Sequence, residues 1–503
     1  MSRSHLKSGW QHRISRRGFL KLTTALGAIS SLNLALGACG QDTPAAGKPT
    51  AASTNQPTAT VPTPGAFLSD ADIRAILQRR VDTGKRSVGI VVGLIDPRGQ
   101  RVVSYGTLGK DRPQPVDGAT VFEIGSISKV FTAALLAIEL EQGAVRLDDP
   151  VAGLLPAEVR VPTRNGAQIT LRHLVTHTSG LPTLPSHFEP RDPLNPYADY
   201  TVEQLYDFLS TYELARDIGA QYEYSNLGLG LLGHLLALKA GTDYEALVKT
   251  RIGAPLGLDS TSISLSAEQQ ARLATGHDMQ RNPVKNWDLP TLAGAGALRS
   301  TANDQLTFLA ANLGLTPTGL LPALRATHSA LHTIQAPEAA IGMAWHINKQ
   351  FGTEIVWHNG STGGYHSFIG FDSARQRGVV VLSNCANPIE DIGFHLLEPK
   401  HKLETFEPIK ERTPVSMDPE IYKQYVGEYE LAPEFVLTVT AEGNSLLVQA
   451  TGQQALEVYP ESETEFFYTV VDARITFVKA DSGEVTGLIL HQNGQNVPGK
   501  KIK

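Results

Sequence analysis

"FEIGSISKVFTAALLAIELEQG" spans residues 122–143 and is typical of an apolar helix with a serine near its start. Ser126 and Lys129 lie three residues apart, so on a helix they share a face and the amine lies near the hydroxyl. Apolar surroundings and the positive end of the helix dipole disfavour an ammonium, so we expect a lowered pKa for Lys129. The stretch predicts a nucleophile beside a base. A helix-capping serine with a surface lysine is the alternative, and Ser4 and Lys7 repeat the spacing.

The length and composition describe a chain with more than one folded unit. With 503 residues it exceeds one ordinary core, and a net charge of -6 without basic blocks gives no footprint for nucleic acid. Cys39 and Cys385 cannot make a disulfide framework or a metal cluster, and we expect Cys385 to be a small buried residue. There is no Gly-x-Ser-x-Gly or His-Glu-x-x-His motif. We predict neither a metal nor a cofactor.

Residues 1–39 are typical of an export signal. Arg16 and Arg17 precede a short apolar segment, the pattern of a twin-arginine leader. The leader ends in Leu-Gly-Ala-Cys at Cys39, which resembles a lipoprotein box, although ordinary cleavage nearby is the alternative. Residues 40–65 are rich in Pro, Thr and Ala and predict an extended linker. We therefore expect an extracytoplasmic protein that is exported by the twin-arginine route and anchored to the membrane at Cys39.

Residues 66–400 predict an α+β domain. Two β-rich runs flank the turn at residues 97–99, and strand patterns return in "EIVWHNG", "HSFIGFDS" and "RGVVVLSN". The segments between them are mostly helical. We predict one antiparallel sheet made from the first and last segments, flanked by helices, with an all-helical lobe between them. A cleft between the sheet and this lobe is the expected place for a site.

Four short motifs follow one another through this domain. They are Ser126-x-x-Lys129, His177-Thr178-Ser179-Gly180, Tyr224-Ser225-Asn226, and His358-Asn359-Gly360 followed by Ser361. In this order and spacing they resemble the serine β-lactamase and penicillin-binding superfamily, and within it the class C β-lactamase-related hydrolases. The resemblance covers residues 65–399.

The resemblance and the chemistry of acyl transfer together imply a role for each residue. Ser126 is the nucleophile, and Lys129 with Tyr224 handles protons, since a nearby lysine cation favours the phenolate. Which of the two takes the first proton is left open. Asn226 is expected to bind a substrate carbonyl and hold Lys129. The resemblance places the oxyanion hole at the backbone N–H groups of Ser126 and Ser361.

The third motif departs from the best-known form of the family. β-Lactamases of that type carry lysine where this chain has His358 and threonine where it has Asn359, and histidine is mostly neutral at pH 7. The change disfavours efficient β-lactam hydrolysis but leaves the acylation residues in place. A hydrogen bond from His358 towards Tyr224 is the structural alternative. We take His177 as structural and Thr178 as shaping a loop.

The C-terminal part predicts a second, smaller unit. Residues 401–417 are polar and broken by prolines, which is typical of a linker. Residues 418–503 alternate short β runs with turns, which predicts a small antiparallel barrel of about six to eight strands. With "YVGEYEL" as its anchor, this barrel resembles the lipocalin-like domain of some β-lactamase-related peptidases. A cover for the cleft, an oligomer contact and an inert appendage all remain open as its role.

The sequence therefore predicts a serine hydrolase that works through an acyl-enzyme on Ser126. The substrate is a small molecule or a peptide, with an ester, a peptide or amide, or a β-lactam as the alternatives. A penicillin-binding lipoprotein that acylates without efficient turnover is the first rival, and a ligand-binding module that never acylates is the second. The oligomeric state is left open.

Overall fold

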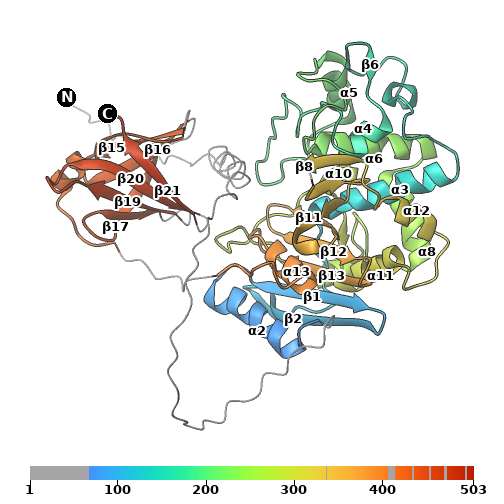
Figure 1. Cartoon of the computed structure of the whole chain (residues 1–503), viewed down its shortest axis with the longest axis horizontal. Helices are drawn as coiled ribbons and strands as arrows, with labels where there is room; N and C mark the ends of the chain where they lie inside the picture. Colours follow the sequence, from blue (N-terminus) through green and yellow to red (C-terminus); the bar gives the residue numbers. More distant parts are fainter. Residues whose placement is uncertain are drawn as a thin grey trace, which may run out of the picture. The chain divides into compact units, whose positions relative to one another are not determined.

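The computed structural model describes residues 67–335, 337–405, 414–432, 435–451, 455–468, 473–492 and 495–503. They form two compact units, one within residues 59–409 and one within residues 410–503, each of which is described by itself (Figure 1). The predicted export signal with Cys39, the linker at 40–65 and residues 406–413 of the linker at 401–417 lie outside the described residues. Among the helices that are described, none is long and apolar enough to cross a membrane.

Within the described residues, nine strands of the larger unit form one sheet in the order β3-β2-β1-β13-β12-β11-β10-β9-β8. The strands are β1 (Gly89–Asp96), β2 (Gly99–Gly109), β3 (Arg112–Pro115), β8 (His332–Gln335), β9 (Ala339–Ile341), β10 (His346–Asn348), β11 (Ile355–Ser361), β12 (His366–Asp372) and β13 (Arg377–Ser383). β1 pairs antiparallel with β13, so the first and last segments of the unit share a sheet. Asp96 pairs with Gly99 at the predicted hairpin turn. The predicted α+β fold with an antiparallel sheet is confirmed.

Helices cover both faces of this sheet and build the lobe beside it. They are α2 (Asp70–Gln78), α3 (Ser128–Glu141), α4 (Leu171–Val175), α5 (Val202–Thr211), α6 (Asn226–Ala240), α7 (Tyr244–Val248), α8 (Ala254–Leu256), α9 (Ala267–Arg272), α10 (Ala293–Gly296), α11 (Ala302–Leu313), α12 (Leu321–Ala326) and α13 (Glu390–Leu397). Short helical turns are η1 (Arg79–Thr83), η2 (Gly125–Ile127), η3 (Val151–Leu154), η4 (Lys249–Gly253), η5 (Gln350–Gly352) and η6 (Pro419–Tyr425).

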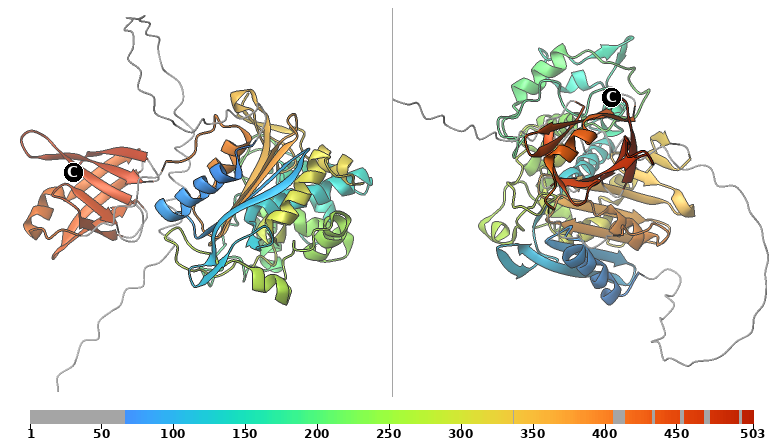
Figure 2. Two further views of the ribbon diagram at one scale, coloured as in Figure 1. Left: turned by 90° about the horizontal axis from the view of Figure 1, so that it is seen from below. Right: turned by 90° about the vertical axis from the view of Figure 1, so that its left-hand side faces the viewer.

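The period of two along a strand divides the apolar core into two parts. Ile90 and Val92 of β1 belong to a smaller cluster with α2 and α13, whereas Val91 belongs to the larger cluster with α3 and α11. Figure 2 shows the sheet between these two layers of helices. Both faces of β1 and β13 are buried. The sequences of these two strands are therefore almost continuously apolar.

Two-residue strands join the start of α3 to a distant segment. β4 (Phe122–Glu123) pairs with β7 (Arg299–Ser300). A separate two-stranded sheet is formed by β5 (Thr163–Arg164) and β6 (Ala167–Gln168). The helix predicted across residues 122–143 is therefore wrong at its N-terminal end, where a strand and the η2 turn come first and α3 begins at Ser128. Pairing with β7 overrides the helical preference of this short segment.

The described strands of the smaller unit close into an eight-stranded antiparallel barrel. In order they are β14 (Gly427–Ala432), β15 (Phe435–Glu442), β16 (Ser445–Ala450), β17 (Ala455–Pro460), β18 (Glu465–Tyr468), β19 (Ala473–Lys479), β20 (Val485–Gln492) and β21 (Gln495–Lys501). Tyr425 is fully buried and stacks on Phe477 at 4.2 Å, and the Tyr429 hydroxyl donates to the Tyr425 carbonyl at 2.7 Å. The predicted barrel is confirmed, while its resemblance to lipocalin-like domains stays a prediction.

Replacement of Phe308 with alanine tests the contact between α11 and α3. Phe308 and Phe131 are both fully buried and stack with ring centroids 4.3 Å apart. We expect Phe308→Ala to lower the free energy of unfolding by about 3–5 kcal/mol, because it leaves a cavity in the core. Urea unfolding followed by tryptophan fluorescence measures this, since residues 410–503 contain no tryptophan. Phe351→Ala, at a side chain 49% exposed, is the matched control, and an equal loss in both variants would contradict the prediction.

Candidate active site

Ser126 lies in the η2 turn, directly before α3. The residue is half-buried, which leaves its hydroxyl within reach of a substrate. Although the turn is not α-helical, Lys129 is still placed as the sequence predicts, and its Nζ lies 2.8 Å from the Ser126 Oγ. The nucleophile and the base candidate are therefore in direct hydrogen-bond contact.

The amine of Lys129 is fully buried and has three oxygen neighbours. Nζ lies 2.8 Å from the Asn226 Oδ1 and 2.7 Å from the backbone carbonyl of Ala295, besides the Ser126 Oγ. Burial holds the pKa of Lys129 well below its ordinary value. Two of the neighbours are carbonyl oxygens, which only accept. A neutral amine satisfies both with its two N–H groups and turns its lone pair to the hydroxyl of Ser126.

The carbonyl of Ala295 reaches Lys129 because α10 packs very closely on α6. A Cβ on Gly294 would lie 2.9 Å from the Cα of Gly233. Sequence reasoning missed this ligand because a backbone carbonyl carries no signature of its own. The run of small residues in "LAGAGA" was the available signal, since it is typical of close approach between backbones.

Tyr224 lies on the loop before α6, and its hydroxyl lies near enough to Ser126 for this side chain to lower the Tyr224 pKa in part. The Nζ of Lys129 lies 4.8 Å from the centroid of its ring. Burial of the hydroxyl raises the pKa of Tyr224 above its ordinary value, and Ser126 offsets only part of this. The expectation that a lysine cation favours the phenolate is therefore wrong here. Burial outweighs the attraction, and the same burial also disfavours the lysine cation.

Asn226 is the first residue of α6 and bridges Lys129 to an aromatic side chain. Its Oδ1 accepts from Lys129, and its Nδ2 donates to the Tyr197 hydroxyl at 3.5 Å. Asn226 does not cap α6, because the Ser225 hydroxyl caps this helix by accepting from the Gly228 N–H at 2.9 Å. The Asn226 amide is thus available to position Lys129.

The η2 turn touches the end of β11 through two glycines. A Cβ on Gly360 would lie 2.0 Å from the carbonyl oxygen of Ile124, and one on Gly125 would lie 2.8 Å from the Ser361 nitrogen. Gly125 also has a φ of +49°, which L side chains rarely adopt. This contact brings the backbone of Ser361 against the η2 turn, which carries Ser126 and is called the nucleophile turn below. The oxyanion hole was predicted at this place.

His358 and Asn359 lie on opposite faces of β11. The Nδ1 of His358 donates to the Asn359 carbonyl at 2.6 Å, and burial lowers the pKa of His358 well below its ordinary value. The Asn359 side chain instead donates to Glu390 at 2.5 Å, on the face that α13 covers. Alternation along the strand explains the separation. The structure therefore places His358 near Tyr224, with 6.3 Å between ring centroids, and directs Asn359 away from it.

Two further histidines join His358 around Tyr224. His177 has a φ of +58° and stacks on Tyr224 at 4.7 Å, and its Nδ1 accepts from the Ser225 N–H at 3.0 Å. His346 of β10 lies 5.2 Å from His358, and burial lowers the pKa of His346 to about 4. His177 was interpreted as structural and His346 was not considered at all. The sequence around His346 does not show that its strand lies beside the strand that carries His358.

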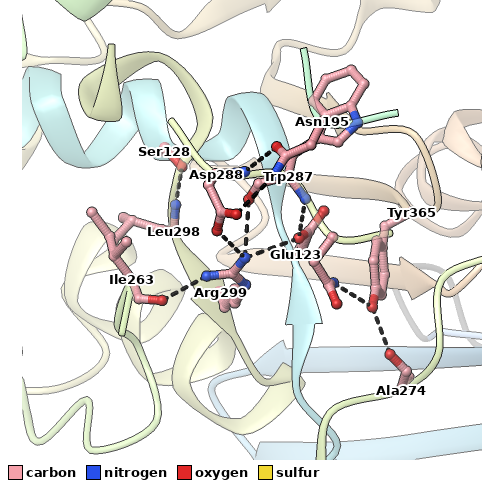
Figure 3. A network of polar contacts seen from close by, with 11 residues as sticks. Glu123, Ser128, Asn195, Ile263, Ala274, Trp287, Asp288, Leu298, Arg299 and Tyr365 are labelled. Carbon is pink, nitrogen blue, oxygen red and sulfur yellow. Dashed lines mark hydrogen bonds and ion pairs between the residues drawn. The ribbon is translucent and has the colours of Figure 1, made fainter. Parts of the chain in front are cut away.

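A buried ion pair lies behind the nucleophile turn (Figure 3). The Arg299 Nη2 lies 3.2 Å from the Glu123 Oε1, and the same nitrogen donates to the Trp287 carbonyl at 2.9 Å. Burial raises the pKa of Glu123 despite the opposing charge of Arg299. The pair ties strand β4 to β7 and to the loop that carries Trp287. In the part of the chain that the structure describes, no group of three or more His, Cys, Asp or Glu is placed to hold a metal ion.

Comparison with known proteins is consistent with this geometry. Residues 73–395 match the family model described as Beta-lactamase. The chain belongs to the Beta-lactamase family. As a member of this family it is a serine hydrolase. Residues 411–501 match a second model, a domain of unknown function named DUF3471.

Several characterised relatives of this Beta-lactamase family member are similar over long stretches. A beta-lactamase of Pseudomonas fluorescens is 27% identical over 349 residues, which cover 62% of this chain and 94% of that protein. The D-alanyl-D-alanine-carboxypeptidase/endopeptidase AmpH of Escherichia coli K12 is 35% identical over 231 residues, which cover 45% of this chain and 57% of AmpH. Penicillin-binding protein 4* of Bacillus subtilis is 25% identical over 425 residues, which cover 80% of this chain and 92% of that protein.

Solved structures of the family share its fold. A class C beta lactamase from Rhodobacter sphaeroides is 26% identical with a TM-score of 0.57, and the match covers 65% of this chain and 99% of that one. The D-alanine carboxypeptidase AmpC from Burkholderia cenocepacia is 26% identical with a TM-score of 0.56, covering 66% of this chain and all of that one (100%).

The burial of Lys129 predicts a pH-dependent contribution to stability. The lysine pKa is about 10.5 in the unfolded chain and lower in the folded protein, so between these values the unfolded chain binds one more proton. Stability therefore rises with pH in this window, by up to about 1.4 kcal/mol per pH unit. We expect the free energy of unfolding of the wild type to rise relative to Lys129→Met as the pH increases towards 10.

Urea unfolding of both proteins at a series of pH values measures this difference. Lys110→Met, at an exposed turn, is the matched control and should show no such trend. A difference between wild type and Lys129→Met that stays flat or falls with pH would show that Lys129 keeps its charge when the chain folds.

Proposed function

We propose that this serine hydrolase cleaves an ester or amide through an acyl-enzyme on Ser126, with Lys129 as the first general base. The contact between the buried Lys129 Nζ and the Ser126 Oγ, at 2.8 Å, is the observation that carries the proposal. Two carbonyl oxygens take the N–H groups of the neutral amine, so its lone pair is directed at the hydroxyl proton. Burial, which lowers the pKa of Lys129 and raises that of Tyr224, supports Lys129 as the first base, a choice that the sequence leaves open.

In the acylation step, the Ser126 Oγ attacks the substrate carbonyl carbon while its proton passes to Lys129. The negative charge that develops on the carbonyl oxygen is met by the N–H groups of Ser126 and Ser361, each worth about 3 kcal/mol in the transition state. The C–O or C–N bond then breaks. The proton reaches the leaving atom from Lys129 through the hydroxyl of Tyr224, which burial keeps in its protonated form.

Deacylation uses the same groups in the opposite sense. A water molecule attacks the ester carbonyl of the acyl-enzyme and gives its proton to the Tyr224 and Lys129 pair. The tetrahedral intermediate collapses, the Ser126 oxygen leaves and takes a proton back from Lys129, and the acid product is released. Lys129 has an acceptor for each of its protons in both states, because three oxygens surround it.

His358 supports an ester or amide over a β-lactam. This residue stands where β-lactamases of the family carry a lysine, and burial lowers its pKa, so it gives the site no permanent cation at neutral pH. The relatives include proteins named as beta-lactamase and as D-alanyl-D-alanine-carboxypeptidase/endopeptidase. Hydrolysis of an ester, an amide or a β-lactam would use the same acylation groups. The residue at position 358 would therefore distinguish these reactions.

The decisive experiment uses the chain from residue 67 onward with a chromogenic short-chain ester and a chromogenic cephalosporin. We expect turnover of the ester, slower or absent turnover of the cephalosporin, and loss of all activity in Ser126→Ala. Lys129→Arg introduces a permanently protonated guanidinium that cannot act as the base, so we expect it to lower kcat by about 10²–10⁴-fold. Intact-mass measurement follows acylation of Ser126 in parallel, and circular dichroism checks that each variant is folded.

The other outcomes separate the rival functions. A stable adduct on Ser126 without turnover would indicate a penicillin-binding lipoprotein. Faster turnover of the cephalosporin than of the ester would overturn the assignment made from His358. If neither reagent reacts and short D-amino-acid peptides also fail, the hydrolase proposal is wrong.

We also propose that the protein is exported by the twin-arginine route and anchored to the membrane by a lipid on Cys39. The support comes from sequence alone, in Arg16, Arg17 and the Leu-Gly-Ala-Cys sequence that ends at Cys39. The Pro- and Thr-rich residues that follow would tether the hydrolase domain to the membrane surface.

Cys39→Ser tests the anchor. In a bacterial host with a twin-arginine system we expect the wild type in the membrane fraction, with a mature N-terminus at Cys39 that carries acyl groups by mass spectrometry. The Cys39→Ser variant should lose the acyl mass and leave the membrane fraction. Cys385→Ser, at a buried position, is the matched control and should stay anchored. A membrane-bound Cys39→Ser variant would contradict the proposal.

A further inference from the structure

Three polar side chains at the start of α3 bind the backbone of residues 294–298, where α10 ends. All three are fully buried. They are Ser128, which accepts from the Leu298 N–H at 3.0 Å (Figure 3), Lys129, which donates to the Ala295 carbonyl at 2.7 Å, and Thr132, which donates to the Gly294 carbonyl at 2.8 Å. The carbonyl that binds the Lys129 amine therefore directly follows a carbonyl that Thr132 binds.

A second hydroxyl sets the direction of the bond from Thr132. The hydroxyl of Tyr244, the first residue of α7, lies 2.7 Å from the Thr132 Oγ1. Each hydroxyl has one proton to donate, and the Gly294 carbonyl only accepts. If Thr132 donated to Tyr244, its Oγ1 would face the carbonyl oxygen of Gly294 at 2.8 Å without a proton between them. Tyr244 therefore donates to Thr132, and Thr132 donates to Gly294. Burial raises the pKa of Tyr244, so its hydroxyl keeps the proton that this arrangement needs.

The backbone of α10 needs such a support because its own sequence gives it little. The helix is a single turn with the sequence Ala-Gly-Ala-Gly, and glycine has the widest choice of backbone conformations. Tyr244 and Thr132 also limit the space around Gly294. A Cβ on Gly233 would lie 2.8 Å from the Gly294 Cα and 3.1 Å from the Tyr244 Cε2, and a Cβ on Gly294 would lie 3.0 Å from the Thr132 Oγ1. The two side chains thus fix the place of α10 as well as the direction of its carbonyl.

The orientation of the Lys129 amine depends on this carbonyl segment. In the proposed mechanism the neutral amine donates to Asn226 and Ala295, and its lone pair then faces Ser126. If the Ala295 carbonyl moved away, one N–H group of the amine would turn towards the Ser126 Oγ. The amine would then donate to the nucleophile instead of accepting its proton. A displacement of about 1 Å is enough to lower the rate of an enzymatic reaction by about 100-fold.

We propose that Thr132 and Tyr244 are positioning residues for the general base, and that their hydroxyls hold the Ala295 carbonyl against Lys129 through the backbone of Gly294. This inference rests on the proposed function, since it concerns the same acylation step. The competing explanation is that both hydroxyls only stabilise the core. That explanation predicts a lower melting temperature without a slower acylation of Ser126.

Thr132→Val tests the inference, because valine has nearly the shape of threonine without its hydroxyl. The full chain reacts with p-nitrophenyl acetate, and intact mass follows acylation of Ser126 in a single turnover. We expect the maximal acylation rate to fall by about 10–100-fold, because the base loses its alignment. The substrate concentration that gives half of this rate should stay within about 3-fold of the wild type, because uniform binding of the substrate is unchanged.

Two further variants assign the effect to the hydroxyls. Thr132→Ser keeps the hydroxyl, so its acylation rate should stay within about 3-fold of the wild type. Tyr244→Phe removes the donor to Thr132 but leaves the bond from Thr132 to Gly294. We expect it to slow acylation by about 3–10-fold, the range for one hydrogen bond, and it tests the inference even if Thr132→Val does not fold.

Thr327→Val is the matched control. Thr327 is fully buried, and its hydroxyl donates to the Leu324 carbonyl at 2.6 Å where α12 ends. The variant removes a hydroxyl of equal burial from another part of the core. It should lower the melting temperature, as Thr132→Val should, while its acylation rate stays within about 2-fold of the wild type.

The outcomes distinguish this inference from the proposed function. If Thr132→Val and Tyr244→Phe acylate as fast as the wild type and only melt at lower temperature, the hydroxyls only stabilise the core and the inference is wrong. A Thr132→Ser variant as slow as Thr132→Val would also overturn it. If the wild type itself forms no acyl adduct on Ser126 and releases no nitrophenol, the proposed function fails, and the positioning role fails with it.

Discussion

The burial of one amine, the Nζ of Lys129, is the constraint on which the rest of the larger unit depends. A lysine inside an apolar core is unfavourable unless its N–H groups find acceptors, and here α6 and α10 each supply one. The close packing of Gly233 against Gly294 is what brings the second acceptor into range. The same burial lowers the pKa of Lys129, which favours the neutral amine that the proposed mechanism needs.

A second consequence of burial is that the aromatic and imidazole groups around this amine are uncharged. Burial lowers the pKa of His177 and His358 and raises that of Tyr224. These side chains therefore offer a substrate little fixed charge. A buried ion pair near this site, Glu123 with Arg299, joins the segment that leads to Ser126 to the loop that carries Trp287. Charge at this site therefore serves to position the backbone.

Much of the fold was predictable because local patterns and tertiary structure agree. The two β-rich runs around residues 97–99 and the late strands form the expected sheet, and the turn-rich C-terminal part closes into the expected barrel. The start of α3 was misplaced because pairing of β4 with β7, far apart in sequence, decides it. The direction of the Tyr224 pKa was also wrong, since proximity to lysine was weighed without knowing how deeply both groups are buried.

The sequence by itself determined the residues that could carry acyl transfer, Ser126, Lys129, Tyr224 and Asn226, because side-chain chemistry and its order along the chain are local properties. Only the tertiary structure decided what surrounds them. The Ala295 carbonyl, His346 and Trp287 reach the site from segments far away in the chain, and alternation along β11 separates His358 from Asn359. The protonation states follow from these surroundings, because desolvation depends on how completely distant segments exclude water.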